Sequence, residues 1–189
     1  MEPVHVLVLR GPAGVGKTTT AYEIGRLLAA RDVPHALIDT DELDRVHPQP
    51  PPDSPGAGLA GSNLAAIWGN FAAAGHSRLV LTGVFADIAS ELPWIAHAVP
   101  GAAFTVARLT ADESTLADRV LRREVGSGAE EQLVRTARQV ETIRRRTGRP
   151  DTVVVDTTGR SVPEVAREVL AGWPPAQERS APPPPTPTG

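Results

Sequence analysis

Residues 11–18 form a glycine-rich segment whose residue types and spacing are those of a phosphate-binding loop. The segment reads Gly-Pro-Ala-Gly-Val-Gly-Lys-Thr and fits the pattern G-x-x-x-x-G-K-[ST] in full. Its glycines let the backbone curl around a polyphosphate, so that consecutive N–H groups and the N-terminus of the following helix point at the anion. The lysine is expected to contact the β and γ phosphates and the threonine hydroxyl to bind Mg²⁺. The predicted phosphate-binding residues are Gly11, Ala13, Gly14, Val15, Gly16, Lys17, Thr18 and Thr19.

Two aspartates, Asp39 and Asp41, are candidates for chemistry beside that loop. Asp39 ends the β-prone run 35–39, and Asp41 follows two residues later. One helix and a return strand bring the carboxyl end of this run next to the phosphate loop. Asp39 can hold Mg²⁺ directly or through water, and Asp41 can accept a proton from an attacking hydroxyl. In the alternative interpretation, Asp39 caps a strand and Asp41 belongs to a solvated acidic turn. Asp156, which ends the apolar run 153–156, is a rival metal-associated acid.

Three arginines, Arg119, Arg122 and Arg123, recur at i, i+3 and i+4 and can lie on one side of a helix. Phosphoryl transfer places charge on the equatorial oxygens of the migrating group, and guanidinium groups stabilise that charge bidentately. Glycines at 126 and 128 follow, as expected for a hinged lid. We therefore predict a lid region at 115–148 in which Arg119 and Arg123 are catalytic. The alternative is an ordinary solvated helix face.

The apolar pattern predicts the elements that must position these groups. Strand-like runs lie at 4–9, 35–39, 78–82, 104–109 and 152–156, and apolar residues at helical spacing fall between them. Capping boxes are expected at 110–113 and 161–164. Strands that alternate with helices predict an α/β fold with a parallel sheet covered on both faces, and a ligand at the carboxyl ends of the strands.

Two proline-rich stretches interrupt this alternation. Residues 40–61 are rich in proline and glycine, so we expect an irregular functional loop there and not a regular element. Residues 174–189 have no apolar surface to anchor them and are expected to form a disordered tail. The predicted domain therefore spans 1–173, with an acceptor-side loop at 40–62.

Length and composition exclude several classes of function. The 189 residues suffice for one domain, and the net charge of −3 provides no basic footprint for nucleic acid. Cysteine is absent, which removes disulfides and thiolate metal sites. No stretch approaches the roughly 18 apolar residues of a membrane span. We expect a soluble cytoplasmic protein, a monomer or homodimer, without a nucleic-acid or membrane partner.

Four pieces of the sequence resemble the small P-loop kinases, a group that includes shikimate, gluconate and adenylylsulfate kinases and chloramphenicol phosphotransferase. The pieces are 11–18, 39–41, 109–123 and 155–160, and the resemblance covers residues 4–172 in element order. It implies a three-layer P-loop NTPase fold with sheet order 2-3-1-4-5. It also implies ATP and Mg²⁺ as cofactors, a lid over ATP, and transfer of the γ-phosphoryl group to a hydroxyl of a small molecule.

The resemblance assigns roles residue by residue. Lys17 and Thr18 would hold phosphate and Mg²⁺, and Asp39 and Asp41 would face the metal and the acceptor. Arg119 and Arg123 would belong to the lid. Arg160 matches the turn beside the adenine, and the turn 157–160 that follows Asp156 is itself suited to packing on a nucleotide base.

Residues on the acceptor side narrow the class of acceptor. Arg45 and Arg78 are the only arginines or lysines between Asp41 and Val99, whereas enzymes that phosphorylate nucleotides need several to clamp a second phosphate. Aromatic residues stand there instead, although such residues more often belong to a core: Trp68, Phe71, Phe85 and Trp94.

This composition favours a neutral or cationic acceptor such as a sugar, a cyclitol or an antibiotic. A nucleoside or nucleotide kinase, and an ATP-binding regulator without transferase activity, remain as alternatives. Shikimate itself is disfavoured, because no arginine closely follows the aspartate pair and Gly83 stands alone where shikimate kinase has a glycine run.

Overall fold

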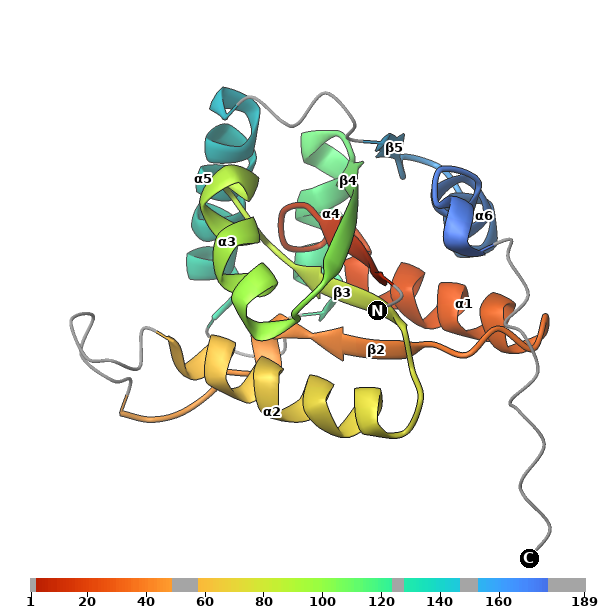
Figure 1. The fold of residues 1–189 in the computed structure, drawn as a ribbon. Coiled ribbons are helices and arrows are strands. Elements are labelled where there is room, and N and C mark those ends of the chain that lie inside the picture. Colours follow the sequence, from red (N-terminus) through yellow and green to blue (C-terminus); the bar gives the residue numbers. More distant parts are fainter. Residues whose placement is uncertain (1–2, 49–57, 124–127, 147–152, 177–189) are drawn as a thin grey trace, which may run out of the picture.

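The computed structural model describes residues 3–48, 58–123, 128–146 and 153–176. Within them, five parallel strands form one sheet in the order β2-β3-β1-β4-β5, as predicted. The order leaves β1 at the centre and puts β2 and β5 at opposite edges (Figure 1). The strands are β1 Val4–Arg10, β2 Ala36–Asp39, β3 Arg78–Gly83, β4 Ala102–Thr110 and β5 Val153–Asp156.

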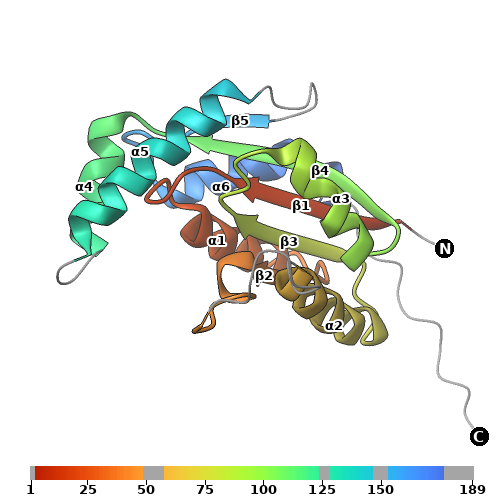
Figure 2. The same cartoon turned by 90° about the vertical axis from the view of Figure 1, so that its left-hand side faces the viewer.

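Helices cover both faces of the sheet and give the three layers expected of this fold (Figures 1 and 2). α1 and α6 pack on one face, and α2 and α3 pack on the other. α4 and α5 pair with each other and stand beyond the end of the sheet toward which the strands point (Figure 2). The helices are α1 Lys17–Ala29, α2 Leu59–Ala73, α3 Ile88–Ala98, α4 Glu113–Arg123, α5 Ala129–Arg145 and α6 Val162–Ala171.

The central strand explains why two separate cores form. Successive side chains of a strand point to opposite faces, so an apolar run such as β1 supplies both layers at once. Leu7 and Leu9 join the core beneath α1 and α6, whereas Val6 and Val8 join the core beneath α2 and α3. All four side chains are fully buried. This packing fixes the carboxyl end of β1, from which the phosphate loop departs.

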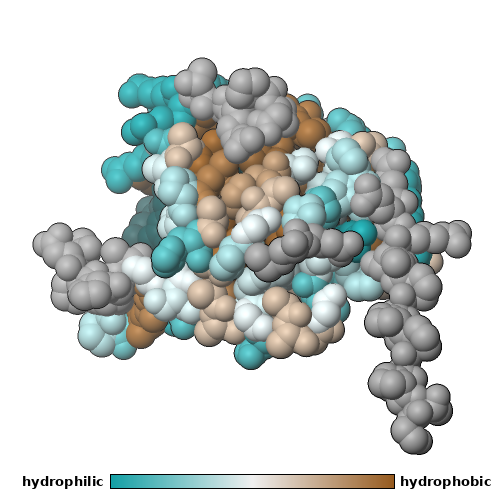
Figure 3. Space-filling view, viewed as in Figure 1, coloured by the Kyte–Doolittle hydropathy of each residue, from teal (hydrophilic) through white to brown (hydrophobic). Residues whose placement is uncertain are grey.

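α5 is attached to the rest of the molecule by few side chains. Only Thr136 and Ile143 of this helix are buried in the described residues. Hydrophilic side chains gather over α5 at the upper left of Figure 3, in contrast to the hydrophobic surface near α3. The helix packs on its neighbour α4, and its partly buried Val140 reaches the core beneath α1 and α6.

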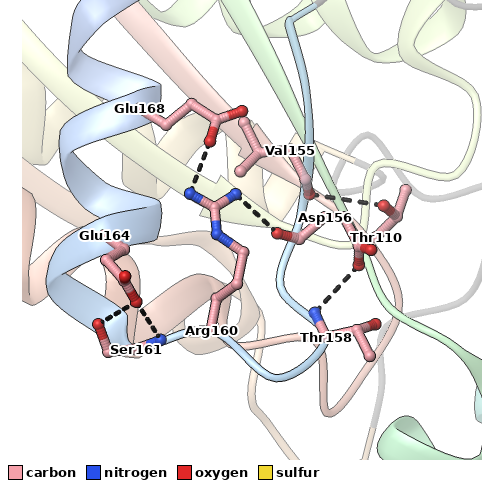
Figure 4. A network of polar contacts seen from close by, with 8 residues as sticks. All are labelled: Thr110, Val155, Asp156, Thr158, Arg160, Ser161, Glu164 and Glu168. Carbon is pink, nitrogen blue, oxygen red and sulfur yellow. Dashed lines mark hydrogen bonds and ion pairs between the residues drawn. The ribbon is translucent and has the colours of Figure 1, made fainter.

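The capping box predicted at 110–113 is wrong. Thr110 ends β4, where its carbonyl accepts a hydrogen bond from Thr157 N at 2.8 Å, so the strand ladder retains it. α4 instead begins after Asp112, whose carboxylate accepts from Thr115 N at 2.6 Å. This hydrogen bond also lowers the pKa of Asp112. The capping box predicted at 161–164 is confirmed at the start of α6, where Glu164 accepts from Ser161 N at 2.9 Å (Figure 4).

The two proline-rich stretches contain more regular structure than expected. A 3₁₀ turn, η1, occupies Thr40–Glu42, and α2 already begins at Leu59, so regular structure is present at both ends of the stretch 40–61. A second 3₁₀ turn, η3, occupies Pro174–Ala176 and buries Ala176, whereas a disordered tail was predicted to start at 174. Arg78 Nε donates to Pro175 O at 3.0 Å, which fixes this turn. The rest of the predicted tail, 177–189, lies outside the described residues.

Candidate active site at the carboxyl ends of the strands

The phosphate loop curls in the way its glycines were predicted to allow. Gly14 and Gly16 have φ values of 78° and 99°, in the region that L side chains rarely adopt. A Cβ atom on Gly14 would also lie 3.0 Å from Val120 Cγ2, so α4 approaches the loop too closely for a side chain there. The loop leads directly into α1, which begins at Lys17. Its N–H groups and the helix N-terminus therefore face the same space.

Lys17 lies almost completely buried at the start of α1, and its Nζ donates to Pro12 O at 3.1 Å. Burial lowers the pKa of this ammonium group, and the positive charge of Arg123 lowers it further. The carboxylates of Asp41 and Asp39 act in the opposite direction. One cation from α1, one from α4 and two acids thus line the same cavity and act on one another electrostatically.

Asp39 is tied to α1 by one carboxylate oxygen and to Asp41 by the other. Thr18 Oγ1 donates to Asp39 Oδ2 at 2.9 Å, and Asp41 N donates to Asp39 Oδ1 at 3.1 Å. The second contact makes Asp39 the N-cap of η1, which turns the chain so that Asp41 follows on the cavity side. The two aspartates and the phosphate loop are thus brought together as the sequence predicted.

Asp41 has a raised pKa, although part of its surface is open to the cavity. The main cause is loss of hydration next to the cavity walls, and the negative charge of Asp39 adds to it. Lys17 opposes both effects because its ammonium group favours the ionised carboxylate. A carboxylate with a raised pKa is a stronger proton acceptor than an aspartate with the ordinary pKa.

A cavity of about 880 Å³ connects these groups. Its walls come from the phosphate loop, from the segment 39–45 and from α4, α5 and the turn after β5. Of the predicted site residues, those that line it are Ala13, Gly14, Val15, Gly16, Lys17, Thr18, Thr19, Asp39, Asp41, Arg119, Arg123 and Arg160. Gly11 does not line the cavity but is needed for the shape of the loop, because a Cβ there would lie 2.7 Å from Leu109 O.

The two predicted lid arginines, Arg119 and Arg123, occupy different surroundings. Arg119 donates to Thr157 Oγ1 at 2.9 Å, to Thr157 O at 3.0 Å and to Val15 O at 3.4 Å. Its guanidinium group therefore joins α4 to the phosphate loop and to the turn after β5. Arg123, one helical turn later, is exposed and acts electrostatically on Lys17. These contacts make Arg119 an anchor, whereas Arg123 is available to a ligand.

Asp156, the rival acid, is directed away from the cavity. It lies on β5, at the opposite edge of the sheet from Asp39, and is absent from the cavity lining. Its carboxylate accepts from Thr158 N at 3.0 Å, which lowers the pKa of Asp156 (Figure 4). Arg160 donates to Asp156 O at 3.0 Å and pairs with Glu168 at 2.7 Å, so the turn 157–160 is held rigidly at the cavity rim.

The aromatic residues expected near the acceptor belong to the core. Trp68 and Phe85 are buried beneath α2 and α3, and Phe71 and Trp94 pack against the same cluster. None of the four lines the cavity in the described residues. The acceptor-side wall is instead formed by Asp41, Glu42, Asp44, Arg45 and Val84. Arg45 pairs with Glu42 at 2.9 Å, so the charge of this wall is predominantly negative.

Two residues that line or support the site were not predicted from the sequence. Gln139, on α5, accepts from Ala13 N at 2.9 Å and lines the cavity, yet it sits in a helix pattern like any polar surface residue. Arg10 is fully buried at the end of β1 and donates to Ala86 O at 3.0 Å, which supports the segment after β3. A charged residue ending an apolar strand was the available signal for Arg10.

Mg²⁺ would find suitable oxygen donors at Thr18 and Asp39. This ion prefers a hydroxyl or carboxylate beside substrate phosphates and retains several waters. Within the described residues there is no group of three or more histidine, aspartate or glutamate side chains that could form a separate metal site. In the same residues, no helix has the length and apolar character required to cross a membrane.

Solved structures of kinases and of a tunicamycin resistance protein share this fold. A gluconokinase from Sinorhizobium meliloti superimposes with a TM-score of 0.58 at 23% identity, covering 92% of this chain and 93% of that one. A tunicamycin resistance protein from Deinococcus radiodurans gives 0.59 at 17% identity, with 90% and 95% covered. The APS kinase of Mycobacterium tuberculosis, in complex with AMPPNP and APS, gives 0.54 at 21% identity, with 90% and 98% covered.

These likenesses extend over nearly the whole of each chain, so the fold is that of this group of P-loop kinases. No protein-family model matches the sequence, and no curated protein matches it significantly. At these identities the likeness is one of fold.

Proposed function

We propose that this protein is an ATP-dependent kinase that transfers the γ-phosphoryl group to a hydroxyl of a small, non-phosphorylated molecule. The observation that carries the proposal is the pairing of Thr18 Oγ1 with Asp39 Oδ2 at 2.9 Å, with Asp41 held next to Asp39. This pairing puts an acid suited to the metal and an acid suited to the acceptor beside a complete phosphate loop.

The loop and Lys17 would bind the phosphates of ATP. Backbone N–H groups of the loop surround the polyphosphate, and the ammonium group neutralises charge on the β and γ phosphates. Mg²⁺ held by Thr18 and Asp39 would supply further neutralisation of phosphate charge. Arg123 would approach the terminal phosphate from α4, since its charge already acts at Lys17. The turn 157–160 would form one side of the space for the nucleotide base.

Asp41 would act as the general base. The oxygen of the acceptor hydroxyl bonds to the γ-phosphorus while the bond from that phosphorus to the β–γ bridging oxygen breaks. The hydroxyl proton passes to the carboxylate of Asp41, and ADP leaves with the electron pair. The raised pKa of Asp41 increases its proton affinity, and Lys17 beside it favours the ionised form required at the start.

The charge of the acceptor-side wall supports a non-phosphorylated acceptor. Of the two basic residues between 41 and 99, Arg45 is paired with Glu42, and Arg78 opens β3 at the far end of the sheet. Neither is placed to clamp a second phosphate group. The acids Asp41, Glu42 and Asp44 would repel one. A sugar, a cyclitol or a hydroxylated amine fits this wall better than a nucleotide, and the gluconokinase fold neighbour is compatible with such an acceptor.

ADP release in the presence of Mg²⁺·ATP tests the proposal. A panel of sugars, cyclitols, aminoglycosides, nucleosides and nucleoside monophosphates is added in turn, with the Asp41→Asn variant as the matched control. A kinase turns over slowly without acceptor and shows a large rise with one class, which the control lacks. ATP hydrolysis that no acceptor changes would favour a regulator, and stimulation by monophosphates would favour a nucleotide kinase.

A further inference from the structure

We propose that Gln139 binds the γ-phosphate of ATP, couples the α4–α5 pair to it and lets the protein distinguish ATP from ADP. The proposal rests on the ATP site proposed above. Its starting point is the hydrogen bond from Ala13 N to Gln139 Oε1, 2.9 Å long, which joins α5 to the phosphate loop. No motif in the sequence assigns any role to this glutamine.

The chemistry of the contact fixes the orientation of the side chain. A backbone N–H can only donate, so the atom of Gln139 that faces Ala13 must be the carbonyl oxygen of the carboxamide. The Nε2 group, with its two N–H donors, is therefore on the other branch of the same planar unit. In the described residues this group makes no hydrogen bond, and the side chain lines the cavity.

The position of the contact points to the terminal phosphate as the partner of those donors. Ala13 follows Pro12, whose carbonyl holds the Nζ of Lys17 at 3.1 Å, so both contacts lie on the same arm of the loop. Lys17 is the residue that would reach the γ-phosphate. Gln139 and Lys17 line the same cavity, so we place the phosphate oxygen that pairs with the ammonium group next to the Gln139 carboxamide.

α5 has little else that fixes it against the loop. Its buried residues are Thr136 and Ile143, its partly buried Val140 packs against the core beneath α1 and α6, and hydrophilic side chains gather over the face seen in Figure 3. A phosphate oxygen bound to Nε2 would consolidate the Gln139–Ala13 contact and hold α5 in place. Because α4 packs on α5, the same event would set the position of Arg123. ADP offers no γ-phosphate oxygen, so it would leave this coupling unused.

Nucleotide affinity measured by calorimetry tests the inference without any acceptor. Gln139→Ala and the near-isosteric Gln139→Met are titrated with Mg²⁺·AMPPNP and with Mg²⁺·ADP. We expect affinity for AMPPNP to fall about tenfold or more, the typical worth of a hydrogen bond to a charged group, and affinity for ADP to change less than about twofold. Gln139→Glu keeps an acceptor for Ala13 N but adds a negative charge, so it should bind AMPPNP more weakly than Gln139→Ala does.

Gln132→Ala is the matched control. Gln132 lies two helical turns earlier on α5, is likewise half-buried, and lines the same cavity, but has no hydrogen bond to the loop. The Gln132→Ala variant should leave the ratio of AMPPNP to ADP affinity unchanged. Equal losses for both nucleotides in the Gln139 variants, or an effect of Gln132→Ala on the ratio as large as theirs, would overturn the inference.

The outcome is separable from that of the kinase proposal. A wild-type protein that discriminates AMPPNP from ADP through Gln139 but phosphorylates no acceptor would retain the inference and refute the kinase assignment. A wild-type protein that phosphorylates an acceptor, together with a Gln139→Met variant that binds both nucleotides normally, would retain the kinase assignment and refute the inference about Gln139. Thermal melting of each variant checks folding, and the methionine variant preserves side-chain length if the alanine variant is unstable.

Discussion

Thr18 and Asp39 share a hydrogen bond of 2.9 Å between Oγ1 and Oδ2, which links the first turn of α1 to the carboxyl end of β2. These two residues are 21 positions apart, and a whole helix separates them. The other carboxylate oxygen of Asp39 holds the backbone of Asp41. One aspartate thus relates the phosphate loop to the proposed general base, and a change at Asp39 should affect both.

Replacement of Asp41 by asparagine should separate activity from stability. Transfer to a verified acceptor is expected to fall about 10²–10⁴-fold, the usual contribution of a general base. Because the folded state raises the pKa of Asp41, any stability linked to this group is present below its unfolded pKa and lost as pH rises through the folded value. At neutral pH the charged carboxylate therefore costs stability, and Asp41→Asn should melt at the same temperature as wild type or higher. Activity within about threefold of wild type would exclude the catalytic role.

The same raised pKa predicts the acid limb of the pH profile. Wild-type kcat/KM should fall as pH drops through the pKa of Asp41, above the value of about 3.9 typical of an exposed aspartate. A Lys17→Met variant removes the cation that lowers the Asp41 pKa, so in its residual activity the limb should move to still higher pH. A limb that does not move would show that another group titrates.

Substitution of Arg119 and substitution of Arg123 by alanine should have different effects on stability, ATP binding and kcat. Arg119→Ala removes three hydrogen bonds that join α4 to Val15 and Thr157, so we expect a lower melting temperature and weaker ATP binding. Arg123→Ala removes an exposed charge and should lower kcat about 10²–10³-fold with little effect on ATP binding. Calorimetry together with single-turnover rates compares the two. Identical behaviour would contradict the division into an anchor and a catalytic arginine.

Gly83→Ala should destabilise the segment that supports the acceptor-side wall. An added Cβ would overlap Thr40 Oγ1 and lie 2.7 Å from the ring of Phe85, which is itself held at a φ of 41°. Overpacking of this kind costs about 1–3 kcal/mol. Gly69→Ala is the control, because a Cβ on that residue of α2 meets nothing within 4 Å. Denaturant unfolding should show a loss for Gly83→Ala and none for Gly69→Ala.

Truncation at two neighbouring positions should locate the end of the domain. Removal of 177–189 is expected to leave the free energy of unfolding unchanged, because that segment offers no apolar anchor. Removal of 174–189 also deletes buried Ala176 and the Pro175 carbonyl that accepts from Arg78. A loss of about 2 kcal/mol is expected for the second truncation only. Equal stability of the two would show that η3 contributes nothing.

Local sequence was sufficient for the features that depend on neighbours along the chain. The glycine spacing of 11–18 predicted a loop whose Gly14 and Gly16 indeed need positive φ. The strand runs and their alternation with helices, read with the family resemblance, predicted the order 2-3-1-4-5. The capping box at 110–113 failed for a non-local reason, because β5 pairs with β4 and holds Thr110 in the strand. The prediction of a disordered tail from 174 was wrong at Ala176 for a similar reason, because burial depends on which distant residues pack over a side chain.

By itself, the sequence determined that a phosphate loop, an acid pair and an arginine-bearing helix occur in this order on an alternating α/β chain. Tertiary structure decided which of them meet. It set Asp39 beside Thr18 and Asp156 at the other edge of the sheet, made Arg119 an anchor, and brought Gln139 to Ala13 across 126 residues. The physical reason is that helix and strand periodicity are local, whereas a hydrogen bond between distant residues depends on how whole layers pack.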